Sequence, residues 1–357
     1  MKKFEKLMVI ILLIGVILFL SIGCNVTSNE KRREKNQESS LPKQINIGIL
    51  RVPNDETIAI SQKIFNKYFT DKGIQCNFIV FDSGVDANKA FASGSIDFAT
   101  MGDTNAIVAL SRGLDVEMIW IHEVLGDIEA LAVKEGSNIH KIEDLVGKKI
   151  ATPFSSTSHY SLLNALKTAG IEDKVELLDM ETTDIVAAWK RGDIQAAYTW
   201  QPSLGELLKD GKVLISSRDL AKQGYITANV GLVRKQFAQQ YPDLVASFIV
   251  CLAEGGNIYR ENPQKGATIA AQELEISPKE ALEQMKGSLW LTPEEQLSKK
   301  YFGTEDSTGG FARTMKDTAD FLEKQGAIQN SPTQEEFNHF LNSSYIQEAI
   351  QILKASK

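Results

Sequence analysis

Between residues 44 and 234, short apolar runs alternate with segments whose apolar residues recur every three or four positions. The runs predict strands, and the periodic segments predict helices. We expect strands at 44–50, 76–81, 97–101, 116–122, 130–134, 149–153, 175–178, 196–199 and 229–234, and helices near 57–69, 86–92, 104–112, 158–169, 183–191 and 204–209. Strands that alternate with helices indicate an α/β fold, in which parallel-rich sheets are covered on both faces.

The pattern changes after residue 236, where helical periodicity dominates. We expect helices at 242–261, 267–273, 278–287, 314–324 and 334–353. This predicts a mostly helical C-terminal region, and no motif in it points to chemistry.

Two segments of the chain resemble each other in spacing and residue type. Each begins with Asp (Asp86 or Asp184), reaches Gly (Gly94 or Gly192) and continues into a short apolar strand. Gly directly after a helix supplies the left-handed turn that ends it. We interpret the match as one helix–turn–strand module in each of two similar lobes.

The N-terminus predicts export. Three lysines precede an apolar run at 7–20, which is shorter than the roughly 20 residues of a membrane-spanning helix and is typical of a secretory signal. Gly23 followed by Cys24 resembles a bacterial lipoprotein processing site, so we expect a signal peptide at 1–23 and a lipid on Cys24. An ordinary signal peptide with an incidental cysteine is the alternative. The polar stretch that follows cannot bury enough surface to fold, so we interpret 24–43 as a disordered tether.

Charge and length narrow the function further. The chain has 357 residues and a net charge of −7, and such an acidic protein has no general attraction to nucleic acid. The part from residue 44 onward is too long for one core and fits two lobes. Cys251 lies in an apolar run and is interpreted as a core residue, while its pairing with Cys76 stays open.

Residues 147–167 combine a strand, a hydroxyl-rich turn and a helix, without any Asp or Glu. Ser155, Ser156 and Thr157 are the N-cap candidates. The free N–H groups and hydroxyl donors at the positive end of the helix dipole suit a sulfonate, phosphate or carboxylate. The alternative is that the hydroxyls only cap the helix.

Ligands of open α/β sheets lie at the carboxyl ends of the strands. The loops at those ends are 82–84 and 102–105 in one lobe, and 155–159 and 200–202 in the other. A ligand held by all four loops would lie in the cleft between the lobes.

Taken together, several phrases in one order resemble the substrate-binding lipoproteins of taurine (aliphatic sulfonate) ABC importers. They include FDSG at 81–84, GDIEAL at 126–131, EDLVGKKIA at 143–151, STSHYSLL at 156–163, AAWKRGDI at 187–194, WQP at 200–202, VRK at 233–235 and LTP at 291–293. The phrases STSHYSLL and AAW are fairly specific for the taurine-like branch. GKKIA and RGDI also occur in binders of nitrate, other sulfonates and thiamine precursors.

The resemblance implies the two-lobed α/β fold of type II periplasmic binding proteins, with crossing segments near 130–134 and 229–234. The first lobe would contain residues 44–130 together with 230–357, which include the C-terminal helices. The second lobe would be 131–229. The two lobes would close on the ligand.

The resemblance also implies ligand contacts. The sulfonate would lie against Ser156, Thr157, Ser158 and the N–H groups around His159, with Asp103 and Thr104 facing it and Trp200 as a wall of the cleft. Asp82, Ser83, Glu129 and Asn229 complete the candidate set, because the amine of taurine needs an acidic or carbonyl partner.

Two of these positions depart from the taurine-like branch. That branch has Asp at the position of Asn229 and a Ser-Pro pair where this chain has Asp103 and Thr104. Either a carboxylate has moved from one wall of the cleft to the other, or the ligand carries a different amine or none.

The first functional hypothesis is a monomeric binding protein without cofactor or metal, anchored by lipid on the extracytoplasmic face of the cell membrane. It would capture taurine or a related small sulfonate or zwitterion and deliver it to an ABC permease. Nitrate or a thiamine-pyrimidine precursor is the alternative ligand, and a sensor is the alternative to an importer component.

The second hypothesis is an enzyme similar to a thiamine-pyrimidine synthase. The four scattered His and the lack of a reactive Cys argue against it. His122 also has no second His at helical distance, which disfavours a zinc site.

Overall fold

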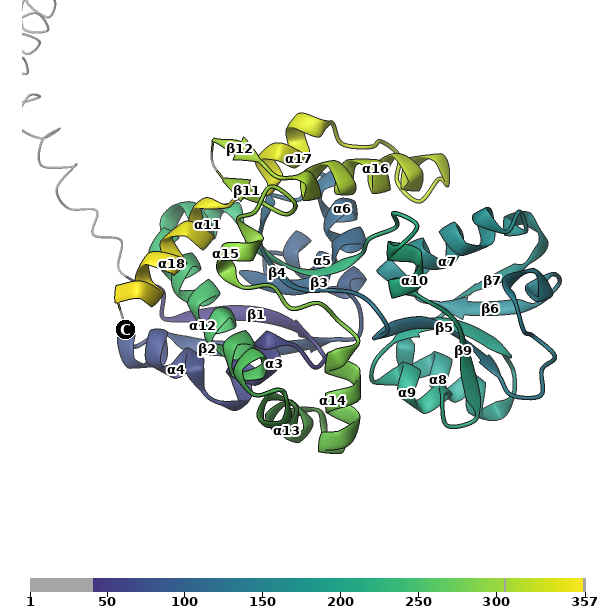
Figure 1. Cartoon of the computed structure of the whole chain (residues 1–357). Coiled ribbons are helices and arrows are strands. Elements are labelled where there is room, and N and C mark those ends of the chain that lie inside the picture. The colour runs from purple at the N-terminus through teal and green to yellow at the C-terminus, as the bar shows by residue number, and fades with distance from the viewer. Residues whose placement is uncertain (1–40, 305, 356–357) are drawn as a thin grey trace, which may run out of the picture. The chain divides into compact units, whose positions relative to one another are not determined.

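Two five-stranded sheets organise the chain, and each forms the centre of one lobe (Figure 1). The computed structural model describes residues 41–304 and 306–355. The strand order is β2-β1-β3-β10-β4 in lobe 1 and β7-β6-β8-β5-β9 in lobe 2. In each sheet the first three strands are parallel, and the fourth (β10 or β5) runs antiparallel to both its neighbours.

Lobe 1 begins with β1 (Gln44–Leu50), α3 (Asp55–Ser61), α4 (Ile64–Tyr68), β2 (Gln75–Phe81), α5 (Gly84–Ala92), β3 (Phe98–Gly102), α6 (Asp103–Ser111) and β4 (Val116–Val124). Lobe 2 contains β5 (Glu129–Lys134), β6 (Lys149–Thr152), α7 (Thr157–Thr168), β7 (Glu176–Asp179), α8 (Thr182–Arg191), β8 (Ala196–Trp200), α9 (Ser203–Leu207), β9 (Gly211–Ser216) and α10 (Ser217–Ala221). The chain then returns to lobe 1 with β10 (Ala228–Arg234) and α11 (Lys235–Gln240).

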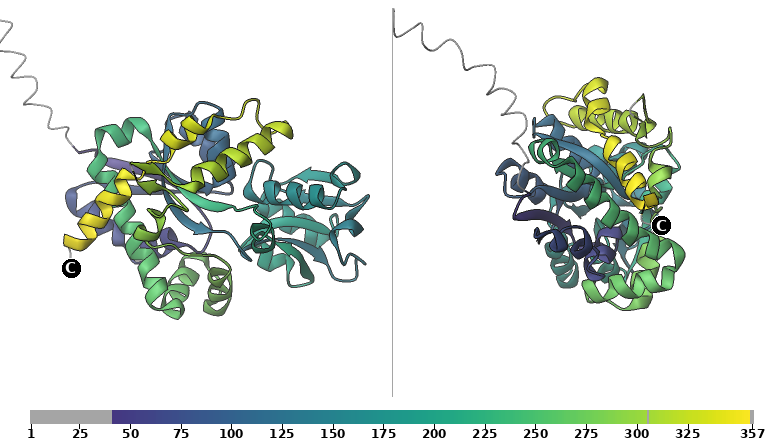
Figure 2. Two further views of the ribbon diagram at one scale, coloured as in Figure 1. Left: turned by 45° about the horizontal axis from the view of Figure 1, so that its top comes forward. Right: turned by 90° about the vertical axis from the view of Figure 1, so that its left-hand side faces the viewer.

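The remaining chain is mostly helical, as the sequence predicted. It contains α12 (Pro242–Glu261), α13 (Pro263–Leu274), α14 (Pro278–Lys286), α15 (Pro293–Gln296), the short strands β11 (Gly303–Thr304) and β12 (Ser307–Thr308), α16 (Gly310–Lys324), α17 (Gln334–Phe340) and α18 (Ser344–Ala355). Figure 2 shows these green to yellow helices gathered on lobe 1.

The chain crosses between the lobes twice. It leaves lobe 1 through residues 125–128 and returns through 222–227. The strands that the sequence placed at the crossings are β5 and β10, which begin directly after them. The expected lobe limits at residues 130 and 229 therefore fall just inside these two strands.

The repeated module is confirmed. Helix α5 is followed by Gly94 and strand β3, and helix α8 is followed by Gly192 and strand β8. Both glycines are left-handed, with φ of 71° and 81°. Each module supplies the middle strand of its sheet, so the two lobes are built on the same plan.

The largest core lies in lobe 1, between its sheet and the buried helix α12. There Phe98 of β3 stacks on Phe248 of α12, with ring centroids 4.2 Å apart. In lobe 2, alternate residues of β5 face opposite sides: Leu131 and Val133 join one hydrophobic cluster, while Ala130 and Ala132 join another. This period of two is expected for a strand covered on both faces.

The sequence reading missed or merged several elements. Strand β9 was not predicted, because it is a half-exposed edge strand preceded by polar residues. The single helix expected at 57–69 is broken at Lys63, whose φ is 55°. The helix expected at 334–353 is broken at residues 341–343, where the side chain of Asn342 accepts from the backbone N–H of Ser344 at 3.1 Å.

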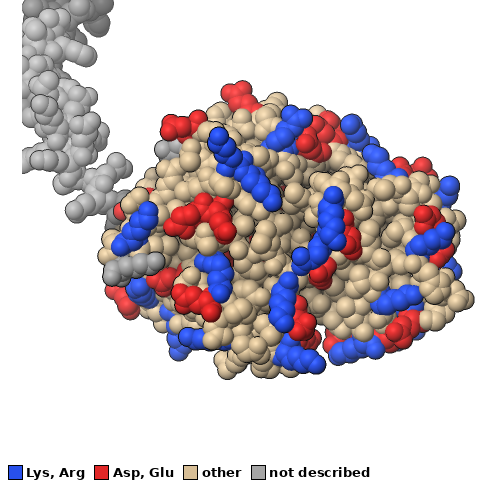
Figure 3. Space-filling view, viewed as in Figure 1, with Lys and Arg blue, Asp and Glu red and all other residues tan. Residues whose placement is uncertain are grey.

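The described cysteines are unpaired: Cys76 is half-buried and Cys251 is buried. The predicted signal peptide (1–23), Cys24 and nearly all of the predicted tether lie outside the described residues. Of the helices that the structure describes, none has the length and apolar character to cross a membrane. On the face in Figure 3, acidic and basic side chains are interspersed rather than gathered in a basic patch.

Candidate functional site

A small cavity lies between the lobes, at the carboxyl ends of β1, β3 and β8, where the sequence placed the ligand. Leu50, Val52, Gly84, Gly102, Asn105 and Asn229 of lobe 1 line it, together with Leu125 and Ile128 of the first crossing segment and Glu129, Ser156, Thr157 and Trp200 of lobe 2. Its volume of about 20 Å³ admits little more than one water-sized sphere. The lobes are therefore closed on each other.

Three helices begin at this cavity. Gly84 is the first residue of α5, Gly102 is the N-cap of α6, and Thr157 is the first residue of α7. No side chain caps α5 or α6, whereas the hydroxyl of Ser156 caps α7 by accepting from the N–H of His159 at 3.2 Å. Helix starts carry partial positive charge and bind anions. None of the residues that line the cavity is Lys or Arg, so its positive potential comes from the backbone.

Glu129 faces these helix starts from lobe 2 and is fully buried. Its Oε1 accepts hydrogen bonds from the hydroxyls of Thr157 at 2.5 Å and Ser158 at 2.7 Å, and its Oε2 accepts from Ser217 at 2.6 Å. Burial raises the pKa of Glu129, and the three hydroxyl donors oppose that effect. Two hydroxyls that the sequence assigned to an anion therefore hold a carboxylate in this closed form.

Asp103 and Thr104 begin α6 and are buried behind the cavity. Oδ1 of Asp103 accepts from the N–H of Thr104 at 2.8 Å. Oδ2 of Asp103 and the hydroxyl of Thr104 are buried, with no hydrogen-bond partner within the described chain. Burial, helped by the nearby Glu129, raises the pKa of Asp103 to about 8. This shift favours the un-ionised form of Asp103 at neutral pH, which limits the negative charge near the cleft.

Direct contacts join the lobes around the cavity. The side-chain amide of Asn105 donates to the carbonyl of Ser155 at 2.8 Å, and the hydroxyl of Ser83 lies 3.4 Å from a carboxylate oxygen of Glu181. Gly102 lies so close to the opposite lobe that an added Cβ would be 2.7 Å from Cγ2 of Thr157. A ligand must therefore enter while the lobes are apart.

Asn229 lines the cavity from β10 and is oriented from behind. Its Nδ2 donates to Oε1 of Glu123 at 2.6 Å. One N–H of the amide is directed to Glu123, so the carbonyl oxygen and the second N–H of Asn229 remain for a ligand. The side chain thus offers the cleft an acceptor without a charge.

Glu123 belongs to a buried polar cluster that also contains Asp55, Glu56 and His122. Nδ1 of His122 lies 2.6 Å from Oδ1 of Asp55. Burial raises the pKa of Glu56 to about 7 and that of Glu123 to about 8. Burial disfavours the charged His122, but the Asp55 carboxylate outweighs it and raises the pKa of His122 to about 9. The cluster therefore holds protons that an unfolded chain would release.

The structure divides the predicted site residues into three groups. Glu129, Ser156, Thr157, Trp200 and Asn229 line the cavity, and Ser83, Asp103, Thr104 and Ser158 are buried at the adjoining helix starts. Asp82 is exposed and does not line the cavity.

His159, like Asp82, does not line the cavity, although its side chain is buried. Its ring stacks on Phe154 at 4.3 Å, and its Nδ1 accepts from the N–H of Ser155 at 3.2 Å. Burial lowers the pKa of His159 to about 4, so the ring is neutral. It shapes the turn before α7 and does not line the cavity.

The sequence reading missed the apolar wall and one hydroxyl. Leu50, Val52, Leu125 and Ile128 line the cavity, but apolar residues at strand ends give no signal that separates them from core residues. Ser217 also escaped notice, because only the folded chain brings it to Glu129. In the part of the chain that the structure describes, no three His, Cys, Asp or Glu side chains are arranged to hold a metal ion.

The fold and the cavity between lobes define a periplasmic-binding-protein architecture. The crystal structure of the periplasmic aliphatic sulphonate binding protein SsuA from Escherichia coli matches 86% of this chain and 100% of its own, with a TM-score of 0.68 and 19% identity. The crystal structure of the desulfurization enzyme DSZB matches 87% of this chain and 100% of its own, with a TM-score of 0.60 and 16% identity. The fold thus serves both binding proteins and an enzyme.

Sequence comparison gives the family. The model described as NMT1/THI5 like matches residues 65–266. The taurine-binding periplasmic protein of Escherichia coli (strain K12) is 35% identical over 289 residues, which cover 79% of this chain and 87% of that protein. The chain belongs to the NMT1/THI5-like family, among the homologues of that periplasmic binding protein. The resemblance drawn from the sequence is confirmed.

Replacing Gly102 by Ala should impair closure selectively. The backbone at Gly102 (φ −64°, ψ 147°) accommodates Ala, so the added Cβ meets only Thr157 Cγ2 of the other lobe as a close contact. Overpacking of this kind costs about 1–3 kcal/mol, so calorimetry should show the dissociation constant of the cleft ligand rising by about 5- to 150-fold, with little change in the melting temperature of the ligand-free protein.

The control for this test is the double variant Gly102→Ala with Thr157→Ser. Ser removes Cγ2 but keeps the hydroxyl that bonds Glu129, so affinity should return. Unchanged affinity in Gly102→Ala would contradict the closed arrangement described here.

The buried cluster predicts that stability falls as pH rises. Glu56 and Glu123 move from an ordinary pKa of 4.5 to about 7 and about 8 on folding, so folding becomes costlier as pH rises from 4.5 toward 8. His122 stabilises the folded state fully below pH 6.5, and this stabilisation is lost as the pH rises through about 9. His122 therefore also makes the folded state less stable at higher pH. The melting temperature should therefore decrease from pH 5 to pH 9, and Glu123→Gln should flatten this slope.

The matched control is Glu273→Gln, which changes an exposed carboxylate on α13 and should leave the slope intact. A melting temperature that rises over this range, or an unaltered slope in Glu123→Gln, would show that the cluster does not hold its protons.

Proposed function

We propose that this protein is the extracytoplasmic solute-binding component of an ABC importer and that it captures taurine or a closely related small sulfonate between its lobes. The observation that carries the proposal is a cavity at which three helices begin, with the buried carboxylate of Glu129 held at the start of α7 and no cationic side chain in the lining. The taurine-binding periplasmic protein at 35% identity supports the same ligand class.

The two ends of the cavity fit the two ends of a zwitterion. The sulfonate would lie at the starts of α5 and α6, where N–H groups and helix dipoles favour an anion. The ammonium would lie near Glu129, with the carbonyl oxygen of Asn229 as a second acceptor. Glu129 is held by three hydroxyl donors, which favour its ionised form.

Charge balance then separates taurine from a simple alkanesulfonate. A zwitterion brings no net charge into the cleft, whereas ethanesulfonate brings an anion beside buried Glu129 with no lining cation to compensate it. We therefore expect taurine to be preferred, even though both ligands have the same sulfonate.

Binding is coupled to lobe closure. The closed cavity of about 20 Å³ is too small for entry, so the ligand would bind the open form and stabilise closure around itself. The permease would then recognise the closed lobes. This mechanism needs neither a cofactor nor an enzyme reaction.

The observations favour binding over catalysis on this fold. The cavity lining contains no Cys, His or Lys. Burial also raises the pKa of the Cys76 thiol to about 11 and that of the Cys251 thiol above its usual value, which makes both poor nucleophiles.

We also propose that a lipid on Cys24 anchors the protein on the extracytoplasmic face of the membrane, and that the anchored protein is a monomer. The apolar run at 7–20 and the Gly23–Cys24 junction support this location. Replacing Cys24 by Ser should abolish labelling by a radioactive fatty acid in the producing cells, and persistent labelling would contradict the anchor.

Ligand selectivity tests the function directly. Calorimetry with taurine, ethanesulfonate, nitrate and an aminopyrimidine should give the tightest binding for taurine. Glu129→Gln removes the charge that pairs with the ammonium. The affinity for taurine should therefore fall by about tenfold or more, the scale of a hydrogen bond to a charged group. The same variant should bind ethanesulfonate more tightly than the unmodified protein does.

Asp82→Asn is the matched control, because Asp82 is exposed and does not line the cavity. It should alter neither affinity. Tight binding of nitrate or the aminopyrimidine without any sulfonate binding would overturn the proposed ligand class.

A further inference from the structure

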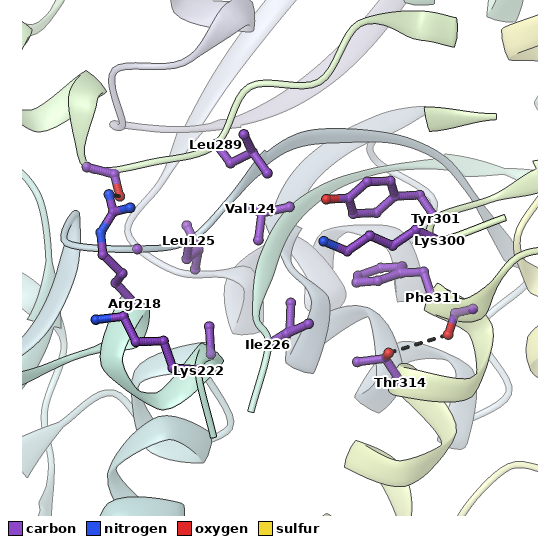
Figure 4. A pocket seen from close by; sticks show the side chains of 14 residues that line it. Val124, Leu125, Arg218, Lys222, Ile226, Leu289, Lys300, Tyr301, Phe311 and Thr314 are labelled. Carbon is purple, nitrogen blue, oxygen red and sulfur yellow. Dashed lines mark hydrogen bonds between the residues drawn. The ribbon is translucent and has the colours of Figure 1, made fainter. Parts of the chain in front are cut away.

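A second and larger pocket of about 490 Å³ lies beside the crossing segments (Figure 4). Both crossings contribute to it, through Leu125 and Gly126 of the first and Ile226 of the second. Leu125 also lines the cavity between the lobes, so the two spaces share one wall. We call this second space the hinge pocket. Its volume lies within the range of small-molecule sites, about 300–1,000 Å³.

The hinge pocket has an apolar body. Val124, Leu125, Ile226, Leu289 and Phe311 supply aliphatic and aromatic surface. Leu289 is half exposed, at 51% of its surface. Exposed apolar surface that lines a concave site is typical of a ligand or partner site.

Two polar groups lie together on one side of the pocket, the hydroxyl of Tyr301 and the ammonium of Lys300. Tyr301 is only 6% exposed, and its hydroxyl makes no hydrogen bond with any described residue. Figure 4 shows this hydroxyl directed into the pocket, with the ammonium group of Lys300 beside it. Lys300 is exposed, and its ammonium lies 5.2 Å from the ring centroid of Tyr301. The hydroxyl opens into the pocket and the ammonium lies beside it, so both donors can reach one external acceptor.

The cations on the opposite side are already neutralised. Arg218 donates to Asp127 at 2.6 Å, and Lys222 pairs with Asp219 at 3.0 Å. The unpaired positive charge therefore lies at Lys300 alone. This asymmetry defines one end of the pocket for an anionic head and leaves the remainder for an apolar tail.

We propose that the hinge pocket binds a small amphipathic anion, with its carboxylate or sulfonate head on Tyr301 and Lys300 and its alkyl tail against Leu125, Ile226 and Phe311. A head with two or three acceptor oxygens can take both donors at once. Each buried methylene of an alkyl tail contributes about 0.8 kcal/mol of binding free energy. The site should therefore prefer an anion with an alkyl tail to a small inorganic anion.

Occupancy of the hinge pocket would favour the closed lobes. Its walls come from lobe 2 (Arg218 and Ala221), from lobe 1 (Tyr301 and Phe311) and from both crossings. A molecule that fills the hinge pocket in the closed form stabilises that form. Because coupling is reciprocal, the hinge-pocket molecule and the cleft ligand each raise the other's affinity by the same factor. This coupling rests on the proposed function, whereas the binding of an amphiphile does not.

The test uses the mature chain and three eight-carbon probes: octanesulfonate, octanoate and octyltrimethylammonium. Calorimetry should show saturable binding of one anion per protein, and the cationic probe should bind at least tenfold more weakly. The two anions distinguish a sulfonate source from a fatty-acid source of the same head-and-tail chemistry. Binding measured with the cleft saturated by taurine should be as tight or tighter, and the taurine dissociation constant should fall severalfold in the presence of the anion.

Tyr301→Phe removes the hydroxyl and keeps the ring, and Lys300→Met removes the charge and keeps the stem. Each variant should lower the affinity for both anions by about tenfold. The affinity for taurine, measured without either anion, should not change. Lys299→Met is the matched control, because Lys299 is exposed and does not line the pocket.

Displacement of octanesulfonate by taurine would place the probe in the cleft and overturn the hinge pocket. So would equal binding of the cationic probe, the absence of saturable binding, or unchanged affinities in both variants. If taurine fails to bind while the anions bind and respond to Tyr301→Phe, the hinge pocket stands and the proposed function falls.

Discussion

The burial of Glu129 at the junction of the lobes is the constraint on which the site depends. A fully buried carboxylate without a cation in the same cavity requires hydrogen-bond donors. Thr157, Ser158 and Ser217 supply them, and all three belong to the starts of helices in lobe 2. The carboxylate thus fixes the hydroxyls, the hydroxyls fix the start of α7, and that helix start faces the positive ends of α5 and α6 across the cavity.

The arrangement separates charge within a very small space. Positive potential comes from backbone dipoles, and the lining contributes one carboxyl group, that of Glu129. Burial raises the pKa of the neighbouring Asp103 and Glu123 to about 8, which favours their un-ionised forms. Asn229 supplies an acceptor without adding charge, because Glu123 fixes its amide from behind. On the proposed function, a net-neutral ligand with charged ends would satisfy both sides of this arrangement.

Much of the fold and part of the site could be predicted from the sequence. Apolar runs and helical periodicity located β1 and α12 with the observed bounds, and the rule for carboxyl ends of strands located the cavity. What failed depends on distant residues. Nothing local to Ser158 indicates that its hydroxyl donates to Glu129, and nothing local to His159 indicates that its ring turns onto Phe154. The apolar wall at Leu50 and Val52 was invisible for the same reason, since only the closed lobes give it a function.

The central claim is that helix starts hold the sulfonate while Glu129 holds the ammonium. A crystal structure of the complex with taurine tests it most directly. The account predicts sulfonate oxygens within hydrogen-bonding distance of backbone N–H groups at the starts of α5 or α6, with the ammonium beside Glu129. A sulfonate bound by lysine or arginine side chains, or a ligand lying in the reverse orientation, would contradict it.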